Sequence, residues 1–377
     1  MPVLCKPSLL LPEHVVSQAE TLRMAERVYA GHPQLDAVLR MIRNTGVEKR
    51  HVIRPVEETL AEVGLGRRQK VYDAAVREML PQVVMEALGH ARLSSADIDA
   101  IVFVSCTGLA MPSPTAWMIN ELGFSWSTAQ IPIAQLGCAA GAAAINRACD
   151  FARAHQGHVL VASCEFCSLL YQPGDHDLGS LLSNGLFGDA VGAAVVRADR
   201  TDEVSAAEAG GGERAEPAVS GLHVTAQGSH VLPGTESWIS YEVTDQGLHF
   251  RLDKGVPSAM AGMVPPLQTF VKEQGHDLAS LDRYAFHSGG PRVLEALRTQ
   301  AGVTDTALRD SVETLADHGN IGSAALLDAL IRTFDSDPPD GATVLAAGFG
   351  PGITMEMFFG TWHRAEEAFA GESERSA

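Results

Sequence analysis

Two segments of this chain share a pattern that limits the fold more than any other feature of the sequence. Residues 137–144 and 319–326 each begin with glycine and one polar side chain, and continue as small residues typical of a closely packed helix. Upstream of them, residues 98–108 and 281–289 each look like a strand that ends in polar residues and glycine. The two pairs are displaced by 182 and 183 positions, so both the order and the spacing are repeated.

A third pair, residues 186–193 and 348–354, repeats a strand pattern broken by glycines, but its offset of 162 positions shows that the halves diverge there. Helical and strand patterns alternate in each half, which predicts an α/β protein with a largely buried sheet. We expect two duplicated halves, residues 1–220 and 221–377, packed as one compact unit. The alternative is a chance similarity between segments rich in glycine and alanine.

Cys138 has the setting of an activated nucleophile. It follows an apolar run over residues 131–136 and precedes a predicted helix over residues 139–154. The free N–H groups and the positive dipole end of a helix N-terminus favour a thiolate over a thiol. The alternative is an inert cysteine that packs as a small hydrophobic residue.

His287 and Asn320 are the expected partners of Cys138. If a pseudo-twofold axis relates the halves, Cys138 and Asn320 lie at paired helix N-termini that face each other, and His287 ends a strand beside them. A nucleophile, a base and a hydrogen-bond donor then converge from distant parts of the chain. Any one of the 14 histidines has a low prior of being catalytic, but the strand-end position of His287 raises it above the others.

Composition excludes several classes of function. The net charge of −18 argues against nonspecific nucleic-acid binding, and an anionic substrate would need a local basic patch. No run of 18 apolar residues predicts a membrane helix, and the first residues lack a signal-peptide layout. Six cysteines in 377 residues do not indicate a disulfide framework, so we expect a cytoplasmic protein.

Five short motifs together carry a family resemblance. They are Gln-Leu-Gly-Cys at 135–138, Gly-Leu-Phe-Gly-Asp at 185–189, His-Ser-Gly-Gly-Pro at 287–291, Gly-Asn at 319–320 and Gly-Phe-Gly-Pro-Gly at 348–352. With them the chain resembles the type III polyketide synthases, the chalcone-synthase-like branch of the thiolase superfamily. The resemblance covers nearly the whole chain except an acidic, glycine-rich segment at 201–217 and the tail at 366–377, which we expect to be surface loop and frayed end. It is strongest to the bacterial enzymes that form tetrahydroxynaphthalene.

The resemblance implies a thiolase-like αβαβα layered fold and a mechanism. Cys138 would take an acyl group from an acyl-CoA, with His287 holding its thiolate as an ion pair. His287 and Asn320 would then stabilise the enolate formed when malonyl-CoA loses carbon dioxide. Repeated condensation and cyclisation would give the product. No metal and no redox cofactor is needed.

The resemblance also assigns residues around the catalytic centre. Phe187 and Phe250 match two phenylalanines that guard the mouth of the cavity, and Met111 matches a methionine that crosses the interface of a homodimer. Arg40 is the candidate contact for CoA phosphate, although Ala37 and Asn44 stand near positions where plant enzymes carry lysine. The residues at the family's cavity-lining positions are Cys106, Cys167, Leu170, Tyr241 and Gly322.

These positions favour malonyl-CoA as both starter and extender. The expected product is the pentaketide 1,3,6,8-tetrahydroxynaphthalene, which oxidises to flaviolin. Leu170 departs from the cysteine of the bacterial relatives, so the chain length or the starter could differ.

Three other functions remain open at this stage. The first is a type III synthase that uses a long-chain or aromatic starter to make pyrones or resorcinols. The second is an enzyme resembling β-ketoacyl-ACP synthase III, although Ser-Gly-Gly-Pro after His287 differs from the His-Gln-Ala-Asn pattern typical there. The third is a thiol–disulfide or metal-binding protein that uses Cys164 and Cys167, but a single C-x-x-C is a weak signal.

Overall fold

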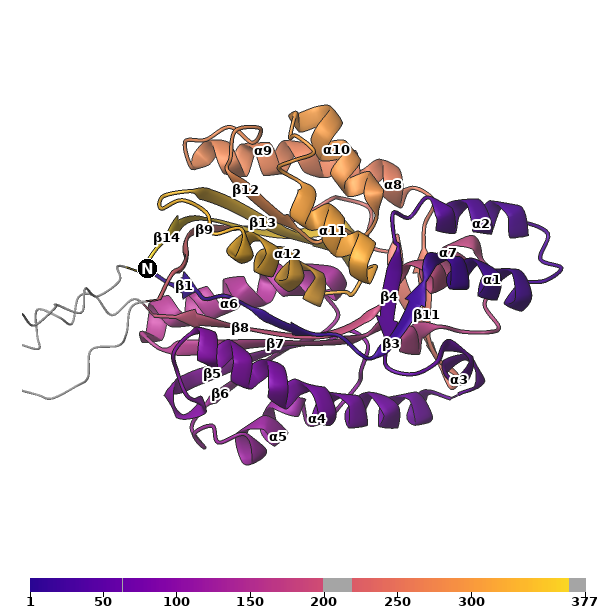
Figure 1. The fold of residues 1–377 in the computed structure, drawn as a ribbon, viewed down its shortest axis with the longest axis horizontal. Helices are drawn as coiled ribbons and strands as arrows, with labels where there is room; N and C mark the ends of the chain where they lie inside the picture. The colour runs from indigo at the N-terminus through magenta and orange to yellow at the C-terminus, as the bar shows by residue number, and fades with distance from the viewer. Residues whose placement is uncertain (63, 199–218, 366–377) are drawn as a thin grey trace, which may run out of the picture.

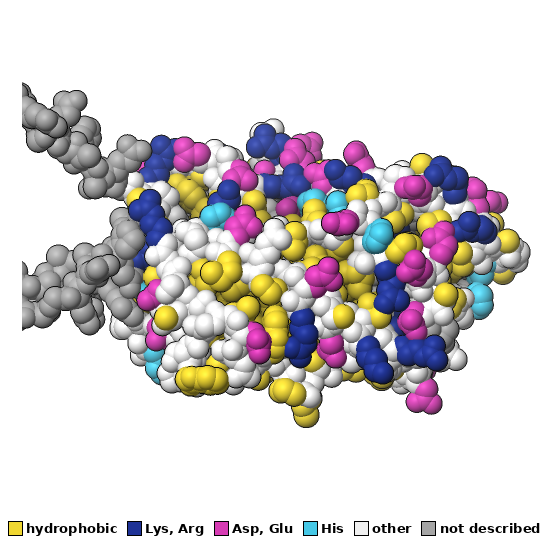
Figure 2. Space-filling view, turned by 60° about the horizontal axis from the view of Figure 1, so that its bottom comes forward, with side chains coloured by type: hydrophobic (Ala, Val, Ile, Leu, Met, Phe, Trp, Pro, Cys, Tyr) yellow, Lys and Arg dark blue, Asp and Glu magenta, His cyan; other side chains and the backbone are white. Residues whose placement is uncertain are grey.

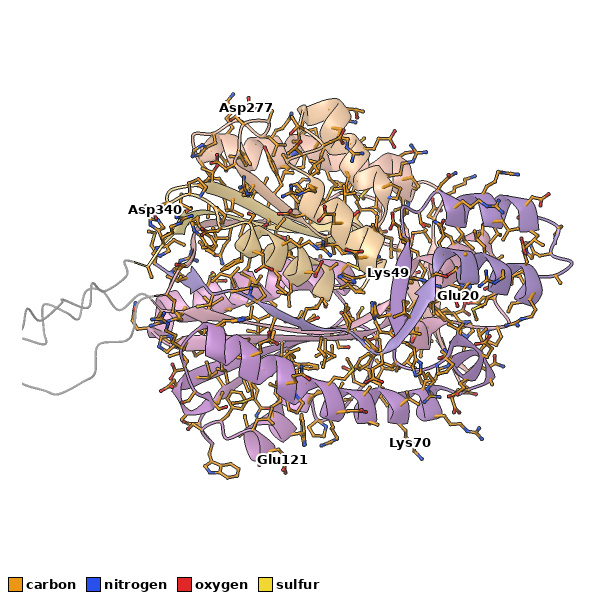
Figure 3. All side chains as sticks on the ribbon, viewed as in Figure 1. Glu20, Lys49, Lys70, Glu121, Asp277 and Asp340 are labelled. Carbon is orange, nitrogen blue, oxygen red and sulfur yellow. The ribbon has the colours of Figure 1, made fainter. Side chains whose placement is uncertain are left out.

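The computed structural model describes residues 1–62, 64–198 and 219–365. The segment at 201–217 and the tail at 366–377 lie outside these residues. Within them, no helix combines the length and the apolar character needed to span a bilayer. Charged side chains such as Lys70 on α4, Glu121 on α5 and Asp277 are exposed and point away from the molecule (Figure 3).

Ten of the described strands form one mixed sheet in the order β12-β13-β14-β9-β1-β8-β7-β5-β6, with β2 paired to β8 (Figure 1). Its strands are β1 (Val3–Leu4), β2 (Ser8–Leu10), β5 (Ile98–Val104), β6 (Ala129–Ile133), β7 (His158–Phe166), β8 (Asp189–Arg197), β9 (Gly221–Val231), β12 (Arg283–Phe286), β13 (Thr343–Gly350) and β14 (Thr354–His363). The short strand β1 pairs with both β8 and β9, and so joins two parts of the sheet, which we call its wings. The first wing holds β2, β8, β7, β5 and β6, and the second holds β9, β14, β13 and β12.

The two wings repeat one pairing pattern. In the first, β5 runs parallel to β7, which runs antiparallel to β8. In the second, β12 runs parallel to β13, which runs antiparallel to β14. The predicted layered α/β fold from two related halves is therefore confirmed. The boundary between residues 220 and 221 stays a prediction.

Helices cover both wings and fill the space between them. The helices are α1 (Gln18–Val28), α2 (Leu35–Arg43), α3 (Val56–Ala61), α4 (Leu65–His90), α5 (Pro114–Glu121), α6 (Ala140–His155), α7 (Leu178–Leu186), α8 (Val256–Ala259), α9 (Val264–Glu273), α10 (Pro291–Ala301), α11 (Arg309–His318) and α12 (Ala324–Asp335). Helices α6 and α12 contact each other and strands of both wings, so they form the central layer. Helices α4 and α5 cover the first wing, while α9 and α10 pack on the second.

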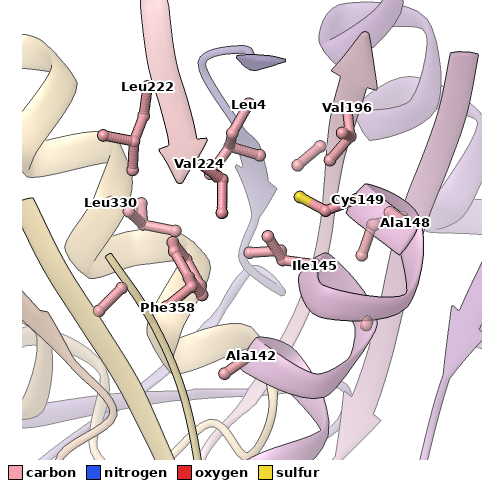
Figure 4. Close-up of a cluster of buried hydrophobic side chains, with 14 of the residues drawn as sticks. Leu4, Ala142, Ile145, Ala148, Cys149, Val196, Leu222, Val224, Leu330 and Phe358 are labelled. Carbon is pink, nitrogen blue, oxygen red and sulfur yellow. The ribbon is translucent and has the colours of Figure 1, made fainter. Parts of the chain in front are cut away.

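Strand side chains alternate between two buried faces. On β13, Val344 and Ala346 join the central core, whereas Leu345 and Ala347 join the core beneath α9 and α10. Burial of both faces explains why these strands read as continuous apolar runs. In the central core, Ile145 and Cys149 of α6 pack among side chains from both wings (Figure 4).

Small residues let the two central helices approach closely. A Cβ atom on Gly141 of α6 would lie 2.3 Å from the Ser323 carbonyl oxygen, just before α12. The run of small residues after Cys138 is therefore required by the contact between the duplicated halves, as its pattern predicted.

One end of the molecule departs from the repeat (Figure 1). It holds helices α1 to α3, α7 and α8 together with two hairpins, β3 (His14–Ser17) with β4 (Lys49–Val52) and β10 (Ile239–Thr244) with β11 (Gly247–Leu252). Helix α7 contacts both α2 and β11. These elements form the wall of the site described next.

Candidate active site

Cys138 lies in a tight turn held by the opposite half. The turn is a 3-10 helix, Gly137–Ala139, that leads directly into α6. Gly137 has φ +50°, and a Cβ atom there would lie 2.6 Å from Pro351 Cδ. The Gly-Phe-Gly-Pro-Gly loop therefore packs against the backbone that presents the thiol, and glycine is required at position 137.

The three predicted catalytic side chains meet. Asn320 Oδ1 lies 3.7 Å from Cys138 Sγ and 3.1 Å from His287 Nε2. His287 directly follows β12, and its backbone N–H donates to the Ala347 carbonyl at 2.9 Å. The predicted convergence of a cysteine, a histidine and an asparagine from distant segments is thus present in the structure.

The hydrogen bonds fix which atom of each group can donate. The backbone N–H of Gly322 donates to Asn320 Oδ1 at 3.0 Å, so Oδ1 is an acceptor. His287 Nε2 must then carry the hydrogen in its bond to Oδ1. The Nδ2 donor of Asn320 remains available, and a Cβ atom on Gly289 would lie 3.8 Å from it. Asn320 Nδ2 and the His287 ring therefore face the same space beside Gly289.

Burial opposes charge on both Cys138 and His287. It raises the pKa of the Cys138 thiol to about 12, with a further increase from Glu165, while the Asn320 contact lowers it. Burial also lowers the pKa of His287 to about 4, which its bond to Asn320 partly offsets. Burial thus disfavours the charged form of each group, and the ion pair expected from the sequence stays a prediction.

The site opens into a cavity of about 1070 Å³. The predicted residues that line it are Cys138, His287, Asn320, Cys106, Cys167, Phe187, Tyr241, Phe250, Gly322 and Arg40. Leu170 does not line it, which corrects that assignment: Leu170 packs behind the wall with Phe187 and Phe250. Met111 does not line it either, and is 97% exposed on the surface.

Similarity to known proteins decides the family. Residues 9–200 match the N-terminal domain of chalcone and stilbene synthases, and residues 221–360 match their C-terminal domain. The chain belongs to the chalcone and stilbene synthase family. It is thus a type III polyketide synthase, and the alternatives based on a carrier-protein synthase or a C-x-x-C site are set aside.

Relatives of known activity cover nearly the whole chain. The 1,3,6,8-tetrahydroxynaphthalene synthase of Streptomyces coelicolor is 49% identical over 97% of this chain and 94% of its own. The phloroglucinol synthase of Pseudomonas fluorescens is 40% identical over 96% of this chain and 99% of its own. The crystal structure of the Streptomyces coelicolor synthase superposes with a TM-score of 0.90, covering 96% of this chain and 100% of that one.

Two phenylalanines meet at the wall of the type III synthase cavity. The rings of Phe187 and Phe250 are 5.2 Å apart at an interplanar angle of 88°. Tyr241 packs on Phe250 at 5.9 Å, and its hydroxyl lies 3.7 Å from Cys106 Sγ. This edge-to-face cluster of three rings forms part of the cavity wall.

Glu165 is a site residue that the sequence did not reveal. It is fully buried near Cys138, and its carboxyl accepts hydrogen bonds from Ser323 Oγ at 2.5 Å and from the Cys106 backbone at 3.1 Å. Burial raises its pKa above the usual value, although these bonds oppose the increase. In the sequence, Glu165 stands out only as an acidic residue near the end of an apolar strand, between the two cysteines of the C-x-x-C motif.

Cys164 and Cys167 do not form one site. Cys164 belongs to the core between β7 and α4, whereas Cys167 lies in the 3-10 helix Cys167–Leu170 and lines the cavity. Among the described residues no group of three potential ligands is placed to hold a metal ion.

The charged side chains at the cavity wall lie on two helices. The lining residues with acidic or strongly basic side chains are Arg40 on α2, and Arg292 and Glu295 on α10. Arg292 pairs with Glu295 at 2.6 Å. Arg292 was not predicted, although it directly follows the His-Ser-Gly-Gly-Pro motif.

Asp189 anchors the segment that carries Phe187. Its buried carboxylate accepts hydrogen bonds from the Ser168 backbone at 2.7 Å, the Ser168 hydroxyl at 2.6 Å and the Ile53 backbone at 2.9 Å. Burial raises its pKa to about 6, so it is mainly ionised at neutral pH.

Replacing Asp189 with asparagine is expected to destabilise the fold by about 1–3 kcal/mol, because an amide N–H₂ would face at least one buried N–H donor. Urea unfolding followed by circular dichroism measures the change. Glu86→Gln on the exposed side of α4 is the control and should change stability little. Equal stability of the two variants would show that these hydrogen bonds do not hold the segment.

Gly289→Ala is expected to lower kcat about tenfold without unfolding the protein. The new Cβ would lie 3.1 Å from His287 Cε1, and the buried ring would have to move away from Asn320. Steady-state rates and thermal unfolding test this. Gly66→Ala, which meets no atom within 4 Å, is the control. An unchanged kcat in Gly289→Ala would contradict the placement of the reacting atoms beside Gly289.

Proposed function

We propose that this protein condenses malonyl-CoA units into a pentaketide and cyclises it to 1,3,6,8-tetrahydroxynaphthalene. The observation that carries the proposal is the contact of Asn320 Oδ1 with Cys138 and His287 at the wall of a 1070 Å³ cavity. Near full-length similarity to a Streptomyces coelicolor synthase of that product supports the product assignment.

The first step loads the starter onto Cys138. Sγ attacks the thioester carbonyl, the new carbon–sulfur bond forms, and the bond to CoA breaks. The thiol proton ends on the CoA sulfur, so both sulfur atoms are neutral before and after the exchange. Since the thiolate is the attacking form, the raised pKa of the Cys138 thiol means that Sγ must lose its proton as the new bond forms.

The second step makes the carbon nucleophile. Malonyl-CoA loses carbon dioxide, and the electron pair of the broken carbon–carbon bond passes to the thioester oxygen. Asn320 Nδ2 is a donor that faces the space beside Gly289, and His287 Nε2 borders the same space. When substrate binds, the Nε2–H of His287 would exchange Asn320 Oδ1 for the developing oxyanion, so that both groups donate to it. The enolate carbon then attacks the carbonyl of the Cys138 thioester, the bond to Sγ breaks, and the chain, now two carbons longer, becomes a thioester of CoA. Transfer back to Cys138, by the same exchange as in the first step, allows the next extension, and no external base is needed to form the enolate.

The choice of malonyl-CoA as starter rests on the similarity to 1,3,6,8-tetrahydroxynaphthalene synthases. The lining of the cavity is mainly apolar, with Cys106 and Tyr241 as polar positions near Cys138. Since Leu170 packs behind the wall, its departure from the bacterial pattern does not change the lining directly. Malonyl-CoA therefore serves as both starter and extender in our proposal.

Arg40 is the proposed contact for CoA phosphate, because it is a cation at the cavity wall of a chain with net charge −18. CoA thioesters are the substrates, and the proposed chemistry requires no metal or redox cofactor.

A homodimer is proposed from the surface near α5. Exposed apolar side chains there include Leu109, Met111 and Trp126, and hydrophobic side chains gather over this side of the molecule (Figure 2).

The test is a reaction of the purified protein with malonyl-CoA alone, with products identified by mass spectrometry. Flaviolin, formed by oxidation of tetrahydroxynaphthalene, is the expected product. If product appears only after a long-chain or aromatic acyl-CoA is added, the mechanism stands and the product assignment is wrong. No condensation with any acyl-CoA would refute the proposed function.

A further inference from the structure

Arg50 is a buried cation that the proposed chemistry does not use. It lies on β4, is 2% exposed, and donates no hydrogen bond to a carboxylate among the described residues. Instead, Nη1 donates to the carbonyl oxygens of Asn184 and Phe187, each at 2.8 Å. Its other acceptors are the hydroxyls of Tyr171 and Thr21. These four hydrogen bonds replace the water that the guanidinium loses on burial, and their loss would be costly.

These two carbonyls lie at the C-terminal end of α7. The last carbonyls of a helix lack partners inside the helix and carry partial negative charge, so a cation there is favourable. Tyr171 reinforces the contact, since its hydroxyl donates to the Phe187 carbonyl at 2.6 Å and accepts from Arg50 Nη1 at 2.6 Å. Arg50 and Tyr171 thus hold the backbone of Phe187 from the same side.

The backbone segment held by Arg50 is hydrogen-bonded directly to the backbone of Asn320. The Asn320 N–H donates to the Leu186 carbonyl at 2.9 Å, and the Gly188 N–H donates to the Asn320 carbonyl at 3.1 Å. Asn320 is therefore bonded to the residues on either side of Phe187. The Phe187 side chain meanwhile meets Phe250 at the cavity wall.

We propose that Arg50 is a positioning residue that fixes both the Phe187 ring at the cavity wall and the Asn320 amide beside Cys138. It acts through the carbonyl of Phe187 and touches neither substrate nor reacting atoms. The proposal rests on the proposed function for the roles of Phe187 and Asn320. It differs from simple stabilisation because it predicts changes in access to Cys138 that loss of stability alone would not cause.

Three variants separate a positioning role of Arg50 from simple stabilisation. They are Arg50→Met, Arg50→Lys and a control, Arg197→Met. Arg197 is also buried and donates to a backbone carbonyl, that of Ala91 at 3.3 Å. It lies at the end of β8 away from Asp189, so it is remote from Phe187. Thermal unfolding of all three variants shows how much stability each substitution removes.

The first readout needs no substrate. Cys138 is alkylated with iodoacetamide, a small reagent, and separately with a bulky maleimide. Peptide mass spectrometry follows the rate of each reaction. The ratio of the bulky-reagent rate to the small-reagent rate reports how accessible Cys138 Sγ is. A change in the pKa of the thiol alters both rates and so largely cancels in the ratio. We expect Arg50→Met to raise the bulky-to-small ratio at least about threefold, with Arg50→Lys in between and Arg197→Met unchanged.

The second readout is carbon dioxide release from malonyl-CoA. We expect kcat to fall about tenfold or more in Arg50→Met, with partial recovery in Arg50→Lys and little change in Arg197→Met. An Arg50→Met variant that alters neither the alkylation ratio nor kcat beyond the Arg197→Met control would overturn the proposal. If the wild-type protein does not decarboxylate malonyl-CoA, the proposed function fails, and the alkylation ratio still tests whether Arg50 positions Phe187.

Discussion

Cys138→Ala is expected to abolish product formation, with a loss of at least about ten-thousand-fold in turnover. The substitution removes the atom that carries the growing chain, and the backbone turn that presents it is held by Gly137 and Pro351 rather than by the side chain. Product formation from malonyl-CoA, followed by mass spectrometry, measures the loss.

The same variant separates two functions of the site. His287 and Asn320 contact each other without the sulfur atom, and Gly322 also holds Asn320. We therefore expect Cys138→Ala to release carbon dioxide from malonyl-CoA at a measurable rate although it forms no product. Unchanged circular dichroism is the control for folding. Continued synthesis of flaviolin would show that another group carries the chain.

Asn320→Ala is expected to lower the decarboxylation rate by about a hundred- to a thousand-fold. It removes one of the two donors that face the enolate oxygen and leaves His287 Nε2 without its partner. Loading of Cys138 with an acyl group should fall by less than about tenfold, because Sγ itself is unchanged. Carbon dioxide release and single-turnover acylation measure the two steps separately.

Asn44→Ala is the matched control for Asn320→Ala. Asn44 lines the same cavity, but it takes no part in the hydrogen bonds that join Cys138, His287 and Asn320. We expect it to affect the KM for malonyl-CoA more than kcat. Equal losses of acylation and decarboxylation in Asn320→Ala would contradict the assignment of Asn320 to the oxyanion site.

The repeated pattern predicted the parts of the structure that depend on local sequence. Glycine followed by small residues predicted a closely packed helix, and the approach of Gly141 to Ser323 shows the physical basis of that packing. The equal offset of Cys138 and Asn320 from the two repeats predicted that they would meet. These predictions succeed because duplicated halves place equivalent residues at equivalent positions.

Interactions between unrelated segments were not predictable in the same way. The partners of Glu165 come from segments around Cys106 and Ser323, and the partners of Arg50 come from α1, α7 and the loop before it. The directions of the pKa shifts at Cys138 and His287 were also not predictable. A helix N-terminus predicts a low thiol pKa, but the loss of water around the thiol outweighs it, and no sequence pattern gives the extent of that loss.

The most direct test of the central claim is to identify what Cys138 carries during the reaction. The protein would be mixed with malonyl-CoA, quenched within the first turnovers and digested, and the Cys138 peptide analysed by mass spectrometry. We expect a series of thioester adducts on Cys138 that differ by successive two-carbon ketide units, with none on Cys106 or Cys167. A Cys138 peptide that stays unmodified while product accumulates would contradict the assignment of Cys138 as the residue on which the polyketide is built.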